Sequence, residues 1–169
     1  MTKHDSSPDQ IQLNLKPCER ETTQTSEISI FQAAEDGDIE TVKQLLANGV
    51  DVDARNVGSN SYDSRDRTAL GLATRKGHIE IVKLLIDEGA DVNVKYNGGF
   101  TPLQDALLKR GNDDIVELLV EKGANVNVQS DRYCPPLEFA LREHFSEHII
   151  ELLIAKGADV NANAGEFLV

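Results

Sequence analysis

The sequence predicts an all-α solenoid of stacked helix-turn-helix units with short β-hairpin loops, and three observations support this prediction. A glycine-led motif recurs four times at spacings of 40, 34 and 34 residues, with its glycines at 49, 89, 123 and 157. An aliphatic pattern with helical spacing precedes each glycine. Each glycine also suits the left-handed residue that ends many helices. Repeats of this length form one supersecondary unit each, so we expect four units stacked in a row.

The second helix of each unit is the more strongly marked. Its aliphatic residues recur at intervals of three to four and form one apolar face. They are Val42, Leu45 and Leu46; Val82, Leu84 and Leu85; Val116, Leu118 and Leu119; and Ile150, Leu152 and Leu153. Four positions before each set stands a residue that begins the helix: Asp38, His78, Asn112 or Ser146. We expect the side-chain oxygens of Asp38, Asn112 and Ser146 to cap backbone N–H groups of the first turn.

A shorter first helix precedes each of these. It begins near Thr68 in the second unit and at Thr101 in the third, where Thr101-Pro102-Leu103-Gln104 combines a capping hydroxyl, an initial proline and a glutamine that bonds back. Small side chains allow the two helices of a unit to approach closely: Ala33, Ala34, Ala73, Ala106 and Ala140. A hairpin of this size cannot bury its own apolar face, so neighbouring units must stack.

These motifs resemble the ankyrin repeat. The resemblance rests on Thr101-Pro102-Leu103, on Gly77-His78-Ile79-Glu80-Ile81-Val82-Lys83-Leu84-Leu85 and on Gly89-Ala90-Asp91-Val92-Asn93. It covers residues 28–162 as units of approximately 28–54, 55–94, 95–128 and 129–162, so residues 28–169 are expected to form one ankyrin repeat domain with a short C-terminal tail. There are departures from the pattern: units three and four carry one extra residue between their helices, Phe145 stands where unit three has Gly111, and Pro135 replaces the capping threonine.

The resemblance implies that projecting β-hairpin fingers and the first helices form a concave face that binds other proteins. It also implies a structural, hydrogen-bonding role for His78. We therefore expect a non-catalytic protein–protein interaction module that acts as an adaptor or inhibitor. An alternative is a structural fragment of a longer array. Phe167, Leu168 and Val169 follow soon after the last glycine, and they either shield the last helix pair or lead into further repeats.

Residues 1–27 lie outside the repeats and are rich in Ser, Thr, Gln, Asp and Glu, so they are predicted to form a disordered polar tail. Within this tail Ile11, Leu13 and Leu15 alternate with polar residues. The alternation is either a small docking segment or chance.

Composition excludes several classes of partner and location. The 29 acidic and 17 basic residues give a formal charge of −12, which disfavours binding to nucleic acid or to an anionic membrane. The sequence has no signal-peptide pattern and no apolar run near the roughly 20 residues that span a bilayer. Cys18 and Cys134 are too few for a disulfide framework and lack metal-ligand spacing. We expect a cytoplasmic monomer without cofactors.

One motif suggests an enzyme. His144, Glu147 and His148 satisfy the H-x-x-E-H zinc pattern, so a zinc-dependent hydrolase is an alternative function. The repeat pattern places His144 in the turn before the second helix and His148 within its first turn. A zinc site of this type needs both imidazoles on one helical face, so we expect no catalytic metal here.

Charge is distributed unevenly between the two parts of each unit. The second helices with their following turns (38–54, 78–94, 112–128 and 146–162) hold 15 acidic and 4 basic residues, whereas the fingers and first helices (28–37, 55–77, 95–111 and 129–145) hold 8 acidic and 10 basic residues. This polarity predicts an acidic or phosphorylated partner segment on the concave face, unless the acidic flank serves only solubility. The finger aromatics either anchor a partner or stack on one another. The predicted contact residues are Arg55, Tyr62, Arg65, Arg67, Arg75, Lys76, Lys95, Tyr96, Phe100, Lys109, Arg110, Arg132, Tyr133 and Arg142.

Overall fold

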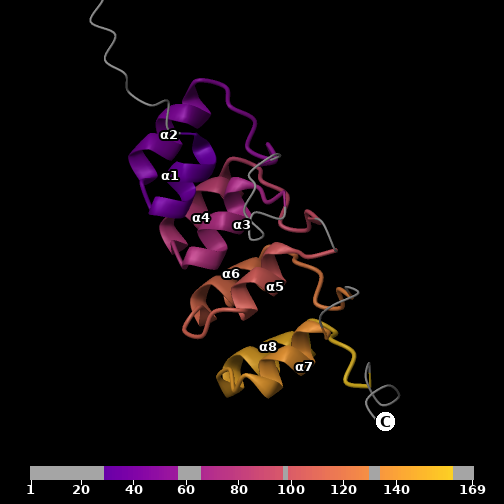
Figure 1. Ribbon diagram of the computed structural model, residues 1–169. Coiled ribbons are helices and arrows are strands. Elements are labelled where there is room, and N and C mark those ends of the chain that lie inside the picture. The colour runs from indigo at the N-terminus through magenta and orange to yellow at the C-terminus, as the bar shows by residue number, and fades with distance from the viewer. Residues whose placement is uncertain (1–28, 57–65, 97–98, 130–133, 162–169) are drawn as a thin grey trace, which may run out of the picture.

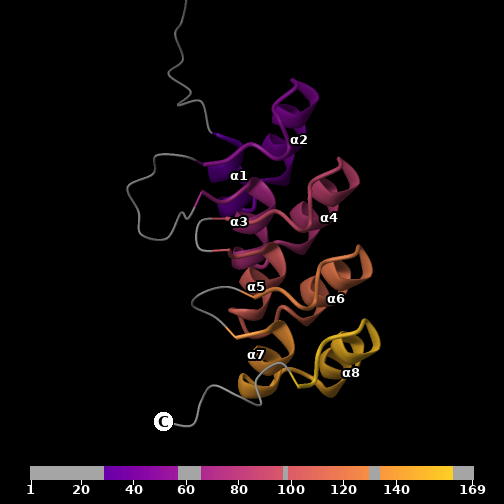
Figure 2. The ribbon, with the colours of Figure 1, turned by 90° about the vertical axis from the view of Figure 1, so that its right-hand side faces the viewer.

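The computed structural model describes residues 29–56, 66–96, 99–129 and 134–161, and these residues form eight α-helices in four antiparallel pairs (Figure 1). The pairs are α1 (Ile30–Asp36) with α2 (Ile39–Ala47), α3 (Ala69–Lys76) with α4 (Ile79–Asp87), α5 (Pro102–Leu107) with α6 (Asp113–Glu121), and α7 (Pro136–Arg142) with α8 (Glu147–Ala155). Figure 2 shows the first helix of each pair in one column and the second helix in another, which is the predicted all-α solenoid. We call the first helices (α1, α3, α5 and α7) the inner helices and the second helices (α2, α4, α6 and α8) the outer helices. The tail 1–27 lies outside the described residues.

The predicted β-hairpin fingers are not seen as strands in the described residues. What is seen there is a backbone hydrogen bond at the base of each of two fingers. The N–H of Asn56 donates to the carbonyl of Arg67 at 3.0 Å, and the N–H of Tyr96 donates to the carbonyl of Phe100 at 2.8 Å. In these two fingers the residues at the base are therefore paired through their backbones.

The core is aliphatic and follows the predicted faces. Ala33, Ala73, Ala106 and Ala140 are fully buried, which confirms that small residues allow the inner and outer helices to approach closely. Because side chains from successive units share one continuous core, each unit is stabilised mainly by its neighbours.

The glycines that end the outer helices adopt the predicted left-handed conformation. Gly49, Gly89, Gly123 and Gly157 have φ between 85° and 92°. A Cβ atom at any of them would meet nothing within 4 Å, so it is backbone conformation and not space that favours glycine here.

The three predicted N-cap residues do precede the outer helices, but only one of them makes the predicted capping hydrogen bond. Asp38 accepts from the N–H of Thr41 at 3.1 Å, as expected. The side chains of Asn112 and Ser146 make no capping hydrogen bond, and for them the prediction is wrong. Nδ2 of Asn112 instead donates to the carbonyl of Thr74, at 3.1 Å, in the preceding unit.

His78 makes the same kind of tie between units. Its Nε2 donates to the carbonyl of Glu35, at 3.0 Å, in the first unit. Its ring also packs on Gly37, since a Cβ atom there would lie 2.8 Å from the ring. The structural role implied for His78 is therefore seen directly.

A ladder of side chains joins the turns that follow the outer helices. Oδ1 of Asn93 accepts from the N–H of Asn125 at 2.7 Å, and Nδ2 of Asn93 donates to the carbonyl of Gly123 at 3.0 Å. Asn127 repeats both bonds to the Gly157 and Asp159 of the fourth unit. At the same position in the first unit, the carboxylate of Asp53 accepts from the N–H of Asp91.

The fourth unit departs from the others at both ends of α7. Because Pro135 has no N–H, Glu138 cannot bond back as Gln104 does to Thr101, and its Oε2 is buried without a partner. After α7 the left-handed residue is His144, with φ of 59°, and not Phe145, which follows it and is buried.

Candidate functional site

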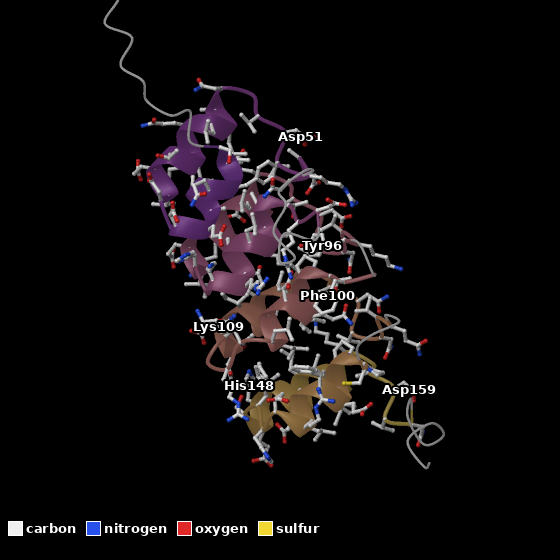
Figure 3. The ribbon with its side chains drawn as sticks, in the orientation of Figure 1. Asp51, Tyr96, Phe100, Lys109, His148 and Asp159 are labelled. Atoms are coloured by element: carbon white, nitrogen blue, oxygen red, sulfur yellow. The ribbon has the colours of Figure 1, made fainter. Side chains whose placement is uncertain are left out.

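The predicted contact residues lie at two opposite edges of the inner-helix surface. Figure 3 shows Tyr96 and Phe100 at one edge, where the fingers join, and Lys109 at the other, where each inner helix turns toward its outer helix. We call these the finger edge and the turn edge. Arg55, Arg67, Lys95, Tyr96 and Phe100 belong to the finger edge, and Arg75, Lys76, Lys109, Arg110 and Arg142 to the turn edge. Tyr62, Arg65, Arg132 and Tyr133 lie outside the described residues.

Arg67 is fully buried, so its assignment to a partner-contacting surface is wrong. Its Nε and Nη2 donate to the two carboxylate oxygens of Asp105, each at 2.8 Å, and Asp105 is fully buried as well. This bidentate ion pair joins the base of the first finger to α5 of the next unit.

Tyr96 and Phe100 are also buried, so their assignment as partner contacts is likewise wrong. They form a small apolar cluster with Val94, and Tyr96 packs on α3, where a Cβ atom on Gly71 would collide with its hydroxyl. The guanidinium carbon of Arg67 lies 5.9 Å from the centre of the Tyr96 ring. Burial, reinforced by the nearby Asp105 charge, raises the pKa of Tyr96 well above its ordinary value, so the phenol stays neutral.

The two remaining residues of the finger edge are exposed. Nη1 of Arg55 donates to the carbonyl of Lys95 at 3.0 Å, which links the bases of successive fingers. Lys95 itself is exposed to solvent, so its ammonium group can reach a partner.

The turn edge carries the larger group of exposed cations. Lys76 pairs with Glu35 at 2.9 Å, and Nζ of Lys109 donates to the carbonyl of Lys76. Arg110 and Arg142 both approach Glu143, at 3.4 and 3.5 Å. Arg75 is half-buried and also has an interaction within the chain. Since exposed ion pairs contribute only about 0–1 kcal/mol, these cations can exchange their partners for a ligand at little cost.

A cleft opens on the turn edge between the third and fourth units. Its volume is about 320 Å³, and its lining comprises Arg110, Gly111, Asp113, Glu143, His144, Phe145 and Ser146. Charges of both signs and the Phe145 ring meet in it, which suits a polar side chain with an apolar stem.

The sequence analysis missed the buried carboxylate of Asp105, although the sequence contains one signal of it. Asp105 occupies the position held by Leu72 in the second unit and Phe139 in the fourth, both of which are buried. A carboxylate at a core position needs a buried cation, and Arg67 is that cation. Comparison of equivalent positions among the repeats could have identified the pair.

The two histidines of the zinc pattern, His144 and His148, lie in different elements of the structure. His144 lies in the left-handed turn before the Ser146 cap, and His148 lies in the first turn of α8. Nε2 of His148 donates to Oε1 of Glu117, at 3.2 Å, on α6. The described residues contain no group of three or more His, Cys, Asp or Glu side chains placed to hold a metal ion.

Among the described helices, none combines the length and apolar character needed to cross a membrane. A family model described as ankyrin repeats, in three copies, matches residues 30–130. The match ends before α7, so the fourth helix pair is recognised from the structure and from its repeated motifs. No curated protein matches the chain.

Proposed function

The chain belongs to the ankyrin-repeat family, whose repeats are protein–protein interaction modules, and we propose that it acts without catalysis as an adaptor or inhibitor. In this proposal an acidic or phosphorylated segment of the partner lies along the turn edge. Buried residues of the finger edge hold the units together, and the turn edge makes the contact.

The observation that supports the proposal is the row of exposed cations at the ends of the inner helices. Lys76, Lys109, Arg110 and Arg142 follow one another along three units of a chain whose formal charge is −12. The ion pairs and hydrogen bonds that they make with the described residues are exposed, and Arg142 also lies 5.0 Å from the centre of the Phe139 ring. An incoming carboxylate or phosphate can replace the exposed contacts. Arginine is especially suited to such groups because its guanidinium binds them in a bidentate manner.

The acidic outer helices orient the partner. They form a separate column in Figure 2, and with their following turns they hold 15 acidic and 4 basic residues. A negatively charged segment is repelled from that flank and attracted to the inner helices, which raises the association rate at low salt. The cleft beside Arg110 receives one side chain of this segment.

A peptide array tests the proposal. The array carries Glu-rich, phosphoserine-containing, neutral and Lys-rich peptides of equal length, and it is probed with the wild-type chain at two salt concentrations. We expect acidic and phosphorylated peptides to bind, with weaker binding at the higher salt. The variant Lys109→Glu/Arg110→Glu/Arg142→Glu is expected to lose at least tenfold in affinity.

The matched control reverses three lysines on the outer helices. Lys43→Glu/Lys83→Glu/Lys122→Glu adds the same charge on the other flank, at side chains about half exposed. It should retain most of the binding. Equal losses in both variants would show that only net charge matters, and binding that survives reversal of the turn edge would reject the proposed site.

A further inference from the structure

The cleft on the turn edge has the opposite charge to the row of cations around it. Its charged lining consists of Arg110, Asp113 and Glu143, so one base faces two acids. The rest of the lining comprises Gly111, His144, Phe145 and Ser146. With His144 neutral, the cleft is net negative, and it attracts a cation more strongly than an anion.

Asp113 supplies a carboxylate that the chain leaves available. It is the first residue of α6 and is half-buried, and no hydrogen bond or ion pair joins its side chain to the described residues. Ile39 and Ile79 begin the outer helices of the first two units at the same position, so the repeat itself does not require an acid there. The carboxylate of Asp113 is therefore free to pair with a cation of a ligand.

An anion fits the cleft less well, because the two helix starts beside it already hold acids. The N-terminus of a helix attracts negative charge. At the start of α6 this charge comes from Asp113 and Asp114, and at the start of α8 it comes from Glu147. These carboxylates would repel a phosphate or carboxylate that entered the cleft.

Glu143 needs a new cation when a partner binds to the turn edge. Its carboxylate lies 3.4 Å from Arg110 and 3.5 Å from Arg142, and its side chain is only 34% exposed. In the proposed function, an acidic group of the partner replaces Glu143 at these two guanidinium groups. Glu143 is then partly buried without its cations, which costs free energy unless another cation takes their place.

We propose that the cleft takes one lysine or arginine side chain of the partner segment, next to the acidic residue that binds Arg110 and Arg142. The charged head lies between Asp113 and Glu143, and the methylene stem lies along the Phe145 ring, as is usual for long basic side chains on apolar surface. This inference rests on the proposed function and makes it more specific. The partner segment is acidic overall and carries one basic residue at a fixed position.

A substitution scan of a bound peptide tests the proposal with the full chain. Each position of a Glu-rich peptide is replaced in turn by lysine, by glutamine and by phosphoserine, and the affinity of every peptide is measured. At one position we expect lysine to bind about fivefold more tightly than glutamine, which is the gain from one partly exposed ion pair. Elsewhere lysine should bind more weakly than glutamine, because the surrounding edge is cationic.

Two matched variants locate the basic side chain. Asp113→Asn/Glu143→Gln removes both carboxylates of the cleft and keeps their shapes, so the preference for lysine should disappear while the glutamine peptide still binds. Asp114→Asn/Glu147→Gln removes the same charge from exposed side chains that do not line the cleft, and it should keep the preference.

Three results would overturn the proposal. They are a scan in which lysine gains at no position, a lysine preference that survives in Asp113→Asn/Glu143→Gln, and phosphoserine binding more tightly than lysine at the preferred position. If the Glu-rich peptide binds and any of these results is found, only this inference fails. If no acidic peptide binds, the proposed function fails and this inference fails with it.

Discussion

The ion pair of Arg67 with Asp105 is a fully buried polar contact between units. Both side chains are fully buried, so each charge depends on the other for the stabilisation that water would otherwise give. We expect Arg67→Met and Asp105→Leu to lower the free energy of unfolding by about 3–5 kcal/mol each, because each removes the bidentate ion pair of a charge that stays buried. Urea unfolding followed by circular dichroism measures this change.

The double variant Arg67→Met/Asp105→Leu is the control for that prediction. It removes both charges and keeps similar side-chain volumes, so it should unfold near the wild type or above it. A double variant as unstable as either single one would show that packing around the pair, and not its charge, is what stabilises the junction.

His144 holds a backbone conformation that favours glycine. Its φ is 59°, in the left-handed region that Gly77 and Gly111 occupy after the inner helices of the second and third units. We expect His144→Gly to raise the free energy of unfolding by up to about 1 kcal/mol, because the strain disappears. The side chain is exposed, so the change removes no core packing.

The reverse substitution at Gly111 provides the comparison. Its Cβ atom would meet nothing within 4 Å, so Gly111→Ala introduces strain without a clash and should destabilise by about 1 kcal/mol. Thermal unfolding of the two variants measures both changes in stability. Shifts of Tm in the same direction would contradict the explanation by backbone strain.

At the scale of elements, the ladder of turn residues joins one unit to the next. Asn93 and Asn127 each make two bonds across a junction, whereas the carboxylate of Asp53 can accept but cannot donate to the carbonyl of Gly89. We expect Asp53→Asn to stabilise the first junction by about 0.5–1 kcal/mol, the contribution of one added hydrogen bond. Chemical unfolding measures it, and the converse change Asn93→Asp should destabilise by a similar amount.

The element boundaries were predictable from the sequence because they depend on local signals. Glycines such as Gly49 and Gly89 end the outer helices through their own backbone conformation, which no distant residue has to supply. The bonds of Asn112 were not predictable in this way. Its side chain fits a local cap equally well, and its partner, the carbonyl of Thr74, lies 38 residues earlier. Only the stacking of units brings the two together.

The arrangement of the whole molecule explains why three of the five described residues of the finger edge are buried. Arg67, Tyr96 and Phe100 are residue types that often anchor interfaces, and the interface they form is the one between successive units of the same chain. Composition cannot distinguish an internal interface from an external one. The turn-edge cations were predictable as a surface because the ends of short helices stay exposed in any stack.

The buried and half-buried polar contacts between units are also unevenly distributed along the stack. His78 joins the first two units through the carbonyl of Glu35, and Arg67 and Asn112 join the second and third. At the last junction the side-chain hydrogen bonds and ion pairs among the described residues are exposed, such as His148 with Glu117. Stability in a solenoid is approximately a sum of unit and junction terms, so the last unit should open most readily.

Amide hydrogen exchange at the two ends of the array tests this uneven stability. Both α1/α2 and α7/α8 are terminal pairs, and we expect α1/α2 to be the better protected because of the His78 tie. His78→Ala should then reduce protection of α1/α2 about fivefold, which corresponds to the roughly 1 kcal/mol contributed by one hydrogen bond, and leave α7/α8 unchanged. Equal protection of all four pairs in the wild-type chain would mean that the array opens as one cooperative unit, and differences between its junctions would then not govern local opening.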